Sequence, residues 1–162
     1  MQDDMPAADT GPDPDEIRAV IADFMALEGP LLPMLHALQA RYRHIPRTAV
    51  AVLAEMLNRG KAEIHGVISF YSDFRYDPPG QHVLKLCRSE ACQANGGREL
   101  AAQALARAGV DWGGTTPDGR LTVEPVYCLG LCACGPAAML DGRLVGRLDE
   151  DGIDRLLQEA RA

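Results

Sequence analysis

Five cysteines are the residues of this chain best suited to chemistry, and they fall into two groups. Cys87 and Cys92 are separated by four residues, Cys128 and Cys132 are separated by three, and Cys134 follows closely. Thiolates hold metal ions and iron–sulfur clusters. A thioredoxin-type redox dithiol needs two residues between its cysteines, and no pair in the chain has that spacing. The pattern therefore favours ligation over dithiol chemistry.

Two kinds of centre suit four such thiols. A [2Fe–2S] cluster takes two protein sulfurs on each iron, so two cysteine pairs on converging loops would hold it. Structural zinc also takes four sulfurs, but it favours tight spacings in a small fold that depends on the metal. We favour the cluster, with zinc and unligated thiols as the alternatives. The glycine-bearing segments CLGLCACG and QANGG could supply the N–H donors that a negatively charged cluster needs.

Cys134 is the thiol left over from the two pairs. It could replace Cys132 as a ligand, because only one residue separates them. Most free cysteines behave as small buried hydrophobic residues. We therefore interpret Cys134 as a packing residue beside the centre.

Composition and charge narrow the surroundings of the chain. Its 162 residues carry a net charge of −7, which argues against binding to a nucleic-acid backbone. The apolar runs are short and broken, so we expect no membrane span. No basic residue precedes Arg18, so we expect no secretory signal and place the protein in the cytoplasm. Thiols stay reduced there, which makes metal ligation more plausible than disulfides.

The first half of the chain predicts an acidic disordered tail and then a helical domain. Residues 1–12 are rich in Asp, Pro, Ala and Gly, as disordered segments often are. Asp13 and Pro14 suit the start of a helix, and apolar residues follow at helical spacing. We expect helices at about 13–27, 32–42, 47–58 and 62–70, which form a bundle over residues 13–78.

Several rings in this half could either pack or face a partner. His65, Phe70, Tyr71 and Phe74 lie at the end of the fourth predicted helix and the residues after it. Their spacing favours packing residues, with a partner interface as the alternative. We interpret His36, within an apolar helix, as half-buried.

The second half predicts an α+β domain over residues 79–162, after the break DPPG. We expect a strand at 82–86, a loop carrying Cys87 and Cys92, a helix at 98–108 and a strand at 121–126 that leads to Cys128. Asp141 and Gly142 are typical of a two-residue hairpin turn, and a last helix covers about 152–160. This order implies a small mixed sheet, in which loops at the same end of neighbouring strands converge.

The residues also resemble a known family. CLGLC, LLPMLHALQ and EIHGVISFYSDF are similar to motifs of the [2Fe–2S] subunit shared by complex I (the 24-kDa subunit), NAD-reducing hydrogenases and NAD-dependent formate dehydrogenases. The resemblance covers about residues 15–160. It implies a thioredoxin-like ferredoxin domain preceded by helices. It also marks Cys87, Cys92, Cys128 and Cys132 as the ligands of one [2Fe–2S] cluster.

Within that family, LCRSEACQANGG, HGVISFYSDFR and EPVYCLGLCACGPAAMLDGRLVGRLD look most like the gamma subunit of NAD-dependent formate dehydrogenase. The resemblance implies a relay of single electrons to or from the FMN of an NAD-binding beta subunit. Formate would be oxidised at a molybdenum or tungsten cofactor of an alpha subunit. The chain itself has no G-x-G-x-x-G, P-loop or H-E-x-x-H motif, so we expect no catalytic residues in it.

Other functions remain as alternatives. The chain could be the equivalent subunit of complex I or of an NAD-reducing hydrogenase. It could also be a free-standing thioredoxin-like ferredoxin, although a solitary carrier would not need the helical half. A zinc-stabilised interaction module is the third possibility.

Overall fold

The computed structural model describes residues 11–162 as two compact units, the first ending at Pro78 and the second beginning at Pro79. All but residues 11 and 12 of the predicted tail lies outside this described range. Within it, none of the helices is both long and apolar enough to cross a membrane.

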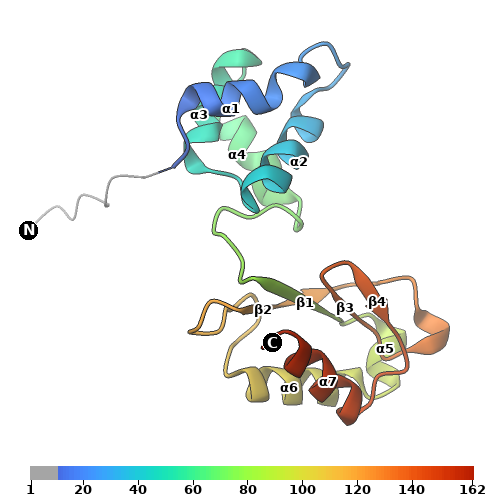
Figure 1. The fold of residues 1–162 in the computed structure, drawn as a ribbon. Helices are drawn as coiled ribbons and strands as arrows, with labels where there is room; N and C mark the ends of the chain where they lie inside the picture. The colour runs from blue at the N-terminus through green and yellow to red at the C-terminus, as the bar shows by residue number, and fades with distance from the viewer. Residues whose placement is uncertain (1–10) are drawn as a thin grey trace, which may run out of the picture. The chain divides into compact units, whose positions relative to one another are not determined.

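The first unit is helical (Figure 1). Its elements are α1 (Pro14–Ile21), the 3₁₀ helix η1 (Ala22–Phe24), α2 (Leu31–Tyr42), α3 (Arg47–Met56) and α4 (Lys61–Phe70). Asp13 caps α1 by accepting a hydrogen bond from the Asp15 amide at 2.8 Å, and Pro14 occupies the first helical position. The first helix is shorter than predicted. After Ile21 the chain tightens into i→i+3 bonds, such as that from the Met25 amide to Ala22.

The core of the helical unit is apolar and draws on every helix. Its fully buried side chains with the largest volumes are Ile17, Ile21, Met34, Leu35, Leu38, Ile45, Leu53, Ile64 and Ile68. These residues recur at three- and four-residue intervals, so each helix turns one face inward.

The predicted packing role of the aromatic residues is correct for Phe74 and wrong for Phe70 and Tyr71. Phe74 is 8% exposed, whereas Phe70 is 80% exposed and Tyr71 43% exposed. Ile64 and Ile68 define the buried face of α4, and Phe70 lies two residues beyond Ile68, on the opposite side of the helix.

The two histidines of this region are also exposed. His36 contacts Phe74 with its ring, at 5.0 Å between centroids, instead of being half-buried as predicted. His65 Nδ1 lies 2.7 Å from the Tyr76 hydroxyl, and the two rings stack. Both side chains therefore cover aromatic surface at the edge of the unit.

The second unit is a four-stranded sheet with helices. Its strands are β1 (His82–Cys87), β2 (Leu121–Val126), β3 (Ala138–Leu140) and β4 (Arg143–Val145), in the order β2-β1-β3-β4. Strands β1 and β2 are parallel, and the other two pairings are antiparallel. The prediction of an α+β fold with a small mixed sheet is thereby confirmed.

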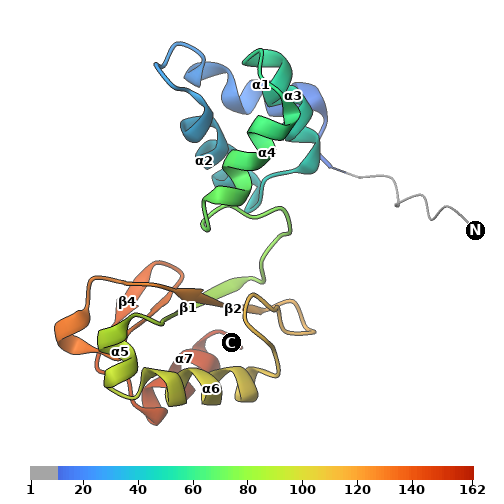
Figure 2. The same cartoon turned by 180° about the vertical axis from the view of Figure 1, so that it is seen from behind.

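Helices α6 (Gly97–Ala108) and α7 (Glu150–Glu159) lie side by side on one face of this sheet (Figures 1 and 2). The short helix α5 (Glu90–Ala94) precedes α6, and the 3₁₀ helix η2 (Cys132–Cys134) follows β2. Alternate strand residues form the core against the two helices, namely Leu84, Leu86, Leu121, Val123, Ala138 and Leu140.

The predicted hairpin turn joins β3 to β4. Asp141 and Gly142 have φ of 49° and 87°, which is the left-handed conformation that such a turn requires. The Asp141 carboxylate also accepts a hydrogen bond from the Val83 amide at 2.8 Å and contacts His82 at 2.6 Å. The turn is therefore fixed to the start of β1.

Candidate metal centre

Parallel pairing brings the two cysteine segments to the same edge of the sheet. Cys87 is the last residue of β1 and pairs with Val126, the last residue of β2. The Arg88 amide extends this pairing with a hydrogen bond of 2.7 Å to the Val126 carbonyl. Because parallel strands end at one edge, Cys87 and Cys128 leave the sheet as neighbours.

Cys92 is supplied by α5, where the sequence predicted only a loop. The helix is five residues long, and side chains hold its ends: Gln93 donates to the Arg88 carbonyl at 2.7 Å, and Asn95 donates to the Ala91 carbonyl at 2.7 Å. One turn is too short to leave a periodic apolar pattern, so the prediction missed it. Figure 1 shows α5 and the orange segment of η2 at the same end of the sheet.

Glycines allow the backbone to pack tightly around Cys92. A Cβ on Gly97 would lie 2.6 Å from the Cys92 carbonyl oxygen, and a Cβ on Gly135 would lie 3.3 Å from Cys92 Sγ. No real Cβ makes the first contact, so the approach of α6 to α5 requires glycine at position 97.

The four predicted cysteines are brought together as two pairs. The sulfurs of Cys128 and Cys132 are 3.8 Å apart, and the side chains of Cys87 and Cys92 interact by a hydrogen bond. The charge of Cys87 also acts on Cys132, so the pairs face each other. Across residues 11–162, no three His, Cys, Asp or Glu side chains are grouped so as to hold one metal ion.

The two pairs differ in their exposure to solvent. Cys87 and Cys92 are 4% and 1% exposed, whereas Cys128 and Cys132 are both exposed. Behind the buried pair, the small cluster around the thiols includes the buried Ala137 and the partly buried side chains Val126, Leu129 and Leu131. The site is therefore apolar on its inner side and open on its outer side.

Burial and hydrogen bonds act in opposite directions on the buried thiols. Burial raises the pKa of Cys87, but hydrogen bonds from the Ser89 hydroxyl, the Ser89 and Leu129 amides and Cys92 outweigh it, so the pKa is lowered. The pKa of Cys92 is raised, first by burial and then by its hydrogen bond with Cys87. The deprotonated form is thus favoured at one member of the pair.

The pKa of Cys132 is raised for a different reason. Its hydrogen bond with Cys128 is the largest cause, followed by the negative charge of the Cys128 thiolate. Two thiolates that are close together disfavour each other's ionisation. A cationic centre between them would remove that repulsion.

Polar groups that could support a negatively charged cluster come from two places. The Gly130 amide donates to Cys128 Sγ at 3.4 Å, as expected for the segment CLGLCACG, whereas Gly97 in QANGG serves close packing. The Ser89 hydroxyl lies 3.2 Å from Cys87 Sγ and was missed from sequence. A serine two residues after the first cysteine was the available signal.

Cys134 has a different environment from the other four. It is half-buried, and its carbonyl accepts a hydrogen bond from the Arg147 amide at 2.6 Å. A Cβ on Gly146 would lie 2.9 Å from the same carbonyl oxygen. The backbone of Cys134 therefore anchors η2 to the segment after β4, which agrees with a packing role.

Two thiol pairs that face each other, buried on one side and supplied with N–H and O–H donors, are a donor set that fits a [2Fe–2S] cluster. Residues 17–161 match the family described as thioredoxin-like [2Fe-2S] ferredoxin. The chain belongs to this family. Membership favours the iron–sulfur interpretation of the cysteines over zinc.

Relatives within the family include components of larger complexes. The chain is 33% identical over 124 residues to a subunit of the NADH-quinone oxidoreductase of Pseudomonas aeruginosa, which is 76% of this chain and 75% of that relative. It is 27% identical over 144 residues to NADP-reducing hydrogenase subunit HndA of Solidesulfovibrio fructosivorans, which is 89% of this chain and 84% of that relative.

A solved structure is similar over most of the chain. The match is to an NAD⁺-reducing [NiFe]-hydrogenase in the air-oxidized state, with a TM-score of 0.67 and 29% sequence identity. It covers 78% of this chain but only 22% of the hydrogenase chain. The similarity therefore concerns one part of that longer protein.

Proposed function

We propose that this ferredoxin-family chain is the [2Fe–2S] electron-transfer subunit of a cytoplasmic NAD-dependent formate dehydrogenase. Cys87, Cys92, Cys128 and Cys132 would be the four ligands. The observation that carries the proposal is the meeting of the two cysteine pairs at the shared edge of β1 and β2. When bound, the cluster would supply one-electron chemistry that no side chain provides.

The chain's own residues would position and insulate that centre. The buried pair, with Ala137 and the neighbouring apolar side chains, would exclude water from its inner side. The exposed pair, Cys128 and Cys132, would leave the outer side accessible to a redox partner. An exposed edge close to the protein surface favours exchange of electrons with a docked partner.

An exposed aromatic residue supports docking at this edge. Tyr127 is 70% exposed and directly precedes Cys128. Tyrosine is enriched at protein interfaces because it combines a large apolar ring with a hydroxyl group. The expected partner is the FMN- and NAD-binding beta subunit, with formate oxidised at the molybdenum or tungsten cofactor of the alpha subunit.

The choice of formate dehydrogenase rests on the resemblance of LCRSEACQANGG and EPVYCLGLCACGPAAMLDGRLVGRLD to its gamma subunit. An equivalent subunit of complex I or of an NAD-reducing hydrogenase is the alternative. The names of the relatives, which are components of an NADH-quinone oxidoreductase and of an NADP-reducing hydrogenase, support that alternative.

Co-expression with the candidate partners tests the proposal. The chain should co-purify with the alpha and beta subunits, and formate-dependent reduction of NAD⁺ should need it. Tyr127→Ser should weaken association with the beta subunit by about tenfold or more, as for a central interface aromatic. Leu144→Ser is the matched control, because Leu144 is a half-exposed apolar residue on β4.

Association with hydrogenase or complex I components, and none with the formate-oxidising subunit, would overturn the specific assignment. Equal weakening by Tyr127→Ser and Leu144→Ser would instead remove the proposed docking edge.

A further inference from the structure

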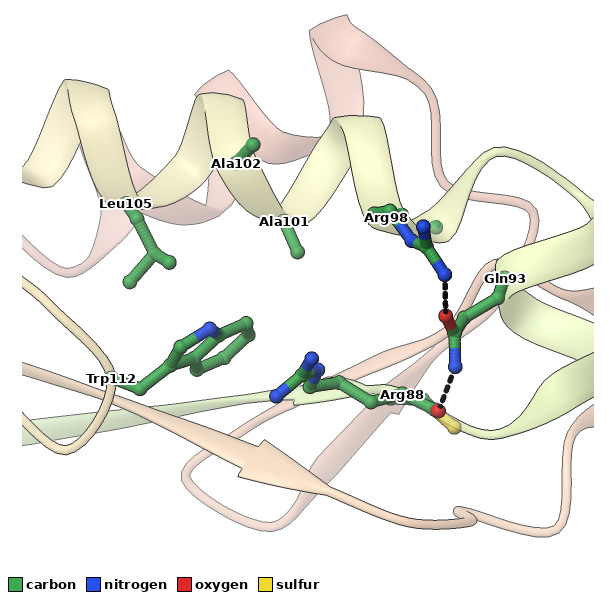
Figure 3. A pocket seen from close by; sticks show the side chains of 9 residues that line it. Arg88, Gln93, Arg98, Ala101, Ala102, Leu105 and Trp112 are labelled. Atoms are coloured by element: carbon green, nitrogen blue, oxygen red, sulfur yellow. Dashed lines mark hydrogen bonds between the residues drawn. The ribbon is translucent and has the colours of Figure 1, made fainter.

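A cavity of about 160 Å³ lies next to the first cysteine, between the end of β1 and α6 (Figure 3). Cys87 itself contributes to its lining. The other side chains that matter for the argument are Arg88, Gln93, Arg98, Ala101, Leu105 and Trp112.

Two guanidinium groups border the cavity without an acidic partner. Arg98 donates to the Gln93 side chain at 2.9 Å, and Arg88 lies over the Trp112 ring at 5.1 Å from its centroid. Figure 3 shows Arg88 and Trp112 side by side below α6, with Arg98 extending from α6 to Gln93. Within residues 11–162, no carboxylate forms a salt bridge with either arginine.

The same cavity has an apolar side. Ala101 and Leu105 project from α6 opposite Trp112, and Ala101 is 5% exposed. The amino-terminal end of α6 adds partial positive charge, because Gly97, its first residue, also lines the cavity. Pockets that bind small molecules combine such apolar walls with a few polar groups that fix orientation.

We propose that this cavity binds a small organic carboxylate. The carboxylate group would lie between Arg88 and Arg98, because guanidinium groups bind carboxylates through paired hydrogen bonds. The hydrocarbon part would contact Ala101, Leu105 and Trp112. At about 30 Å³ for each water-sized group, the cavity accommodates roughly five or six non-hydrogen atoms, which is the size of butyrate.

Inorganic phosphate fits this cavity less well than an organic acid. Phosphate is hydrated on all sides, and it would leave the apolar surface of Ala101 and Leu105 in contact with water. A short organic acid covers that surface as well as pairing with the arginines. Burial of this surface should therefore make the organic acid bind more tightly.

Occupancy would affect the neighbouring centre. Arg88 directly follows Cys87, so a bound carboxylate would offset a positive charge close to the cluster and make its reduction less favourable. This consequence rests on the proposed function, whereas the binding site itself does not.

Trp112 makes the site measurable, because it is the only tryptophan in the chain. Butyrate is titrated into the full-length protein at constant ionic strength, with chloride as the balancing salt. Trp112 fluorescence and calorimetry should both show saturable binding. Arg88→Gln and Arg98→Gln should each raise the dissociation constant by about tenfold, through loss of one charge-assisted hydrogen bond. Arg155→Gln, at a side chain that is 72% exposed on α7, should leave it unchanged.

Three results would overturn the proposal. The first is that butyrate is indistinguishable from chloride in both measurements. The second is that Arg155→Gln weakens binding as much as Arg88→Gln and Arg98→Gln. The third is that phosphate binds as tightly as butyrate, which would remove the apolar part of the site. None of these results bears on whether the cysteines hold a cluster, so the two proposals fail separately.

Discussion

The four candidate ligands owe their positions to different local causes. Cys87 is fixed by strand pairing with Val126, and Cys92 is fixed by a one-turn helix that packs on Gly97. Cys128 and Cys132 follow β2 and approach each other to 3.8 Å. The buried pair is thus held by regular structure, and the exposed pair by a loop that begins at the same sheet edge.

At the residue scale, Tyr76 provides a test by pH. Burial raises its pKa, and the nearby Arg47 opposes the shift only in part. The neutral phenol is also placed to hydrogen-bond with His65 at 2.7 Å. A raised pKa means that the folded unit binds this proton more tightly than the unfolded chain does. Its contribution to stability is therefore complete below the ordinary value of 10.0 and is lost as the pH rises above it.

Urea unfolding of the helical unit, followed by circular dichroism at about pH 9 and about pH 11, measures this effect. The native chain should lose more stability between the two pH values than the variant Tyr76→Phe, which has no phenol to ionise. Equal losses in the two proteins would show that Tyr76 makes no such contribution.

Residue chemistry was partly predictable from sequence. The four cysteines stand out because few other residue types ligate iron, and their spacings separate them from redox dithiols. Ser89 did not stand out, because serine is common in loops and its contact with Cys87 depends on the turn into α5. The second arginine of the cavity, Arg98, was equally hidden, since only the packing of α6 brings it near Arg88.

At the element scale, regular strands and long helices were predictable, and short elements were not. The strands β1 and β2 and the helix α6 have clear apolar patterns, and Asp141 with Gly142 identifies the hairpin. Helix α5 has five residues, which is fewer than two turns, so no period can be read from it. The exposure of Phe70 depends on which face of α4 is buried, and that is set by its neighbours.

Two glycines in helices should respond in opposite ways to alanine. Gly66, in the middle of α4, has open space around the position of a Cβ, whereas a Cβ on Gly97 would lie 2.6 Å from the Cys92 carbonyl oxygen. Gly66→Ala should stabilise the helical unit by about 0.5–1 kcal/mol, through helix propensity alone. Gly97→Ala should destabilise the second unit by about 1–3 kcal/mol, as overpacking does.

Native-state hydrogen exchange resolves the two effects, because it reports the opening free energy of each unit separately. Slower exchange in α4 of Gly66→Ala and faster exchange in α5 and α6 of Gly97→Ala are expected. Stabilisation by Gly97→Ala would mean that α6 does not approach Cys92 as closely as described.

At the scale of the whole molecule, the division of labour follows from what each unit contains. All five cysteines lie in the second unit, which carries the sheet and the candidate centre. The helical unit has its own core and exposes aromatic residues such as Phe70 and Tyr71. Exposed aromatic residues of this size are typical of interaction surfaces. A chain that combines a carrier with a separate helical unit suits assembly into a larger complex.

The most direct test of the account is the iron and acid-labile sulfide content of the purified chain, with its electron paramagnetic resonance signal after reduction. We expect about two irons and two sulfides per chain and a rhombic signal. Serine at position 87, 92, 128 or 132 should abolish or alter that centre, whereas Cys134→Ser should leave it intact. A colourless protein holding one zinc, or a chromophore that survives all four single serine substitutions, would contradict the account.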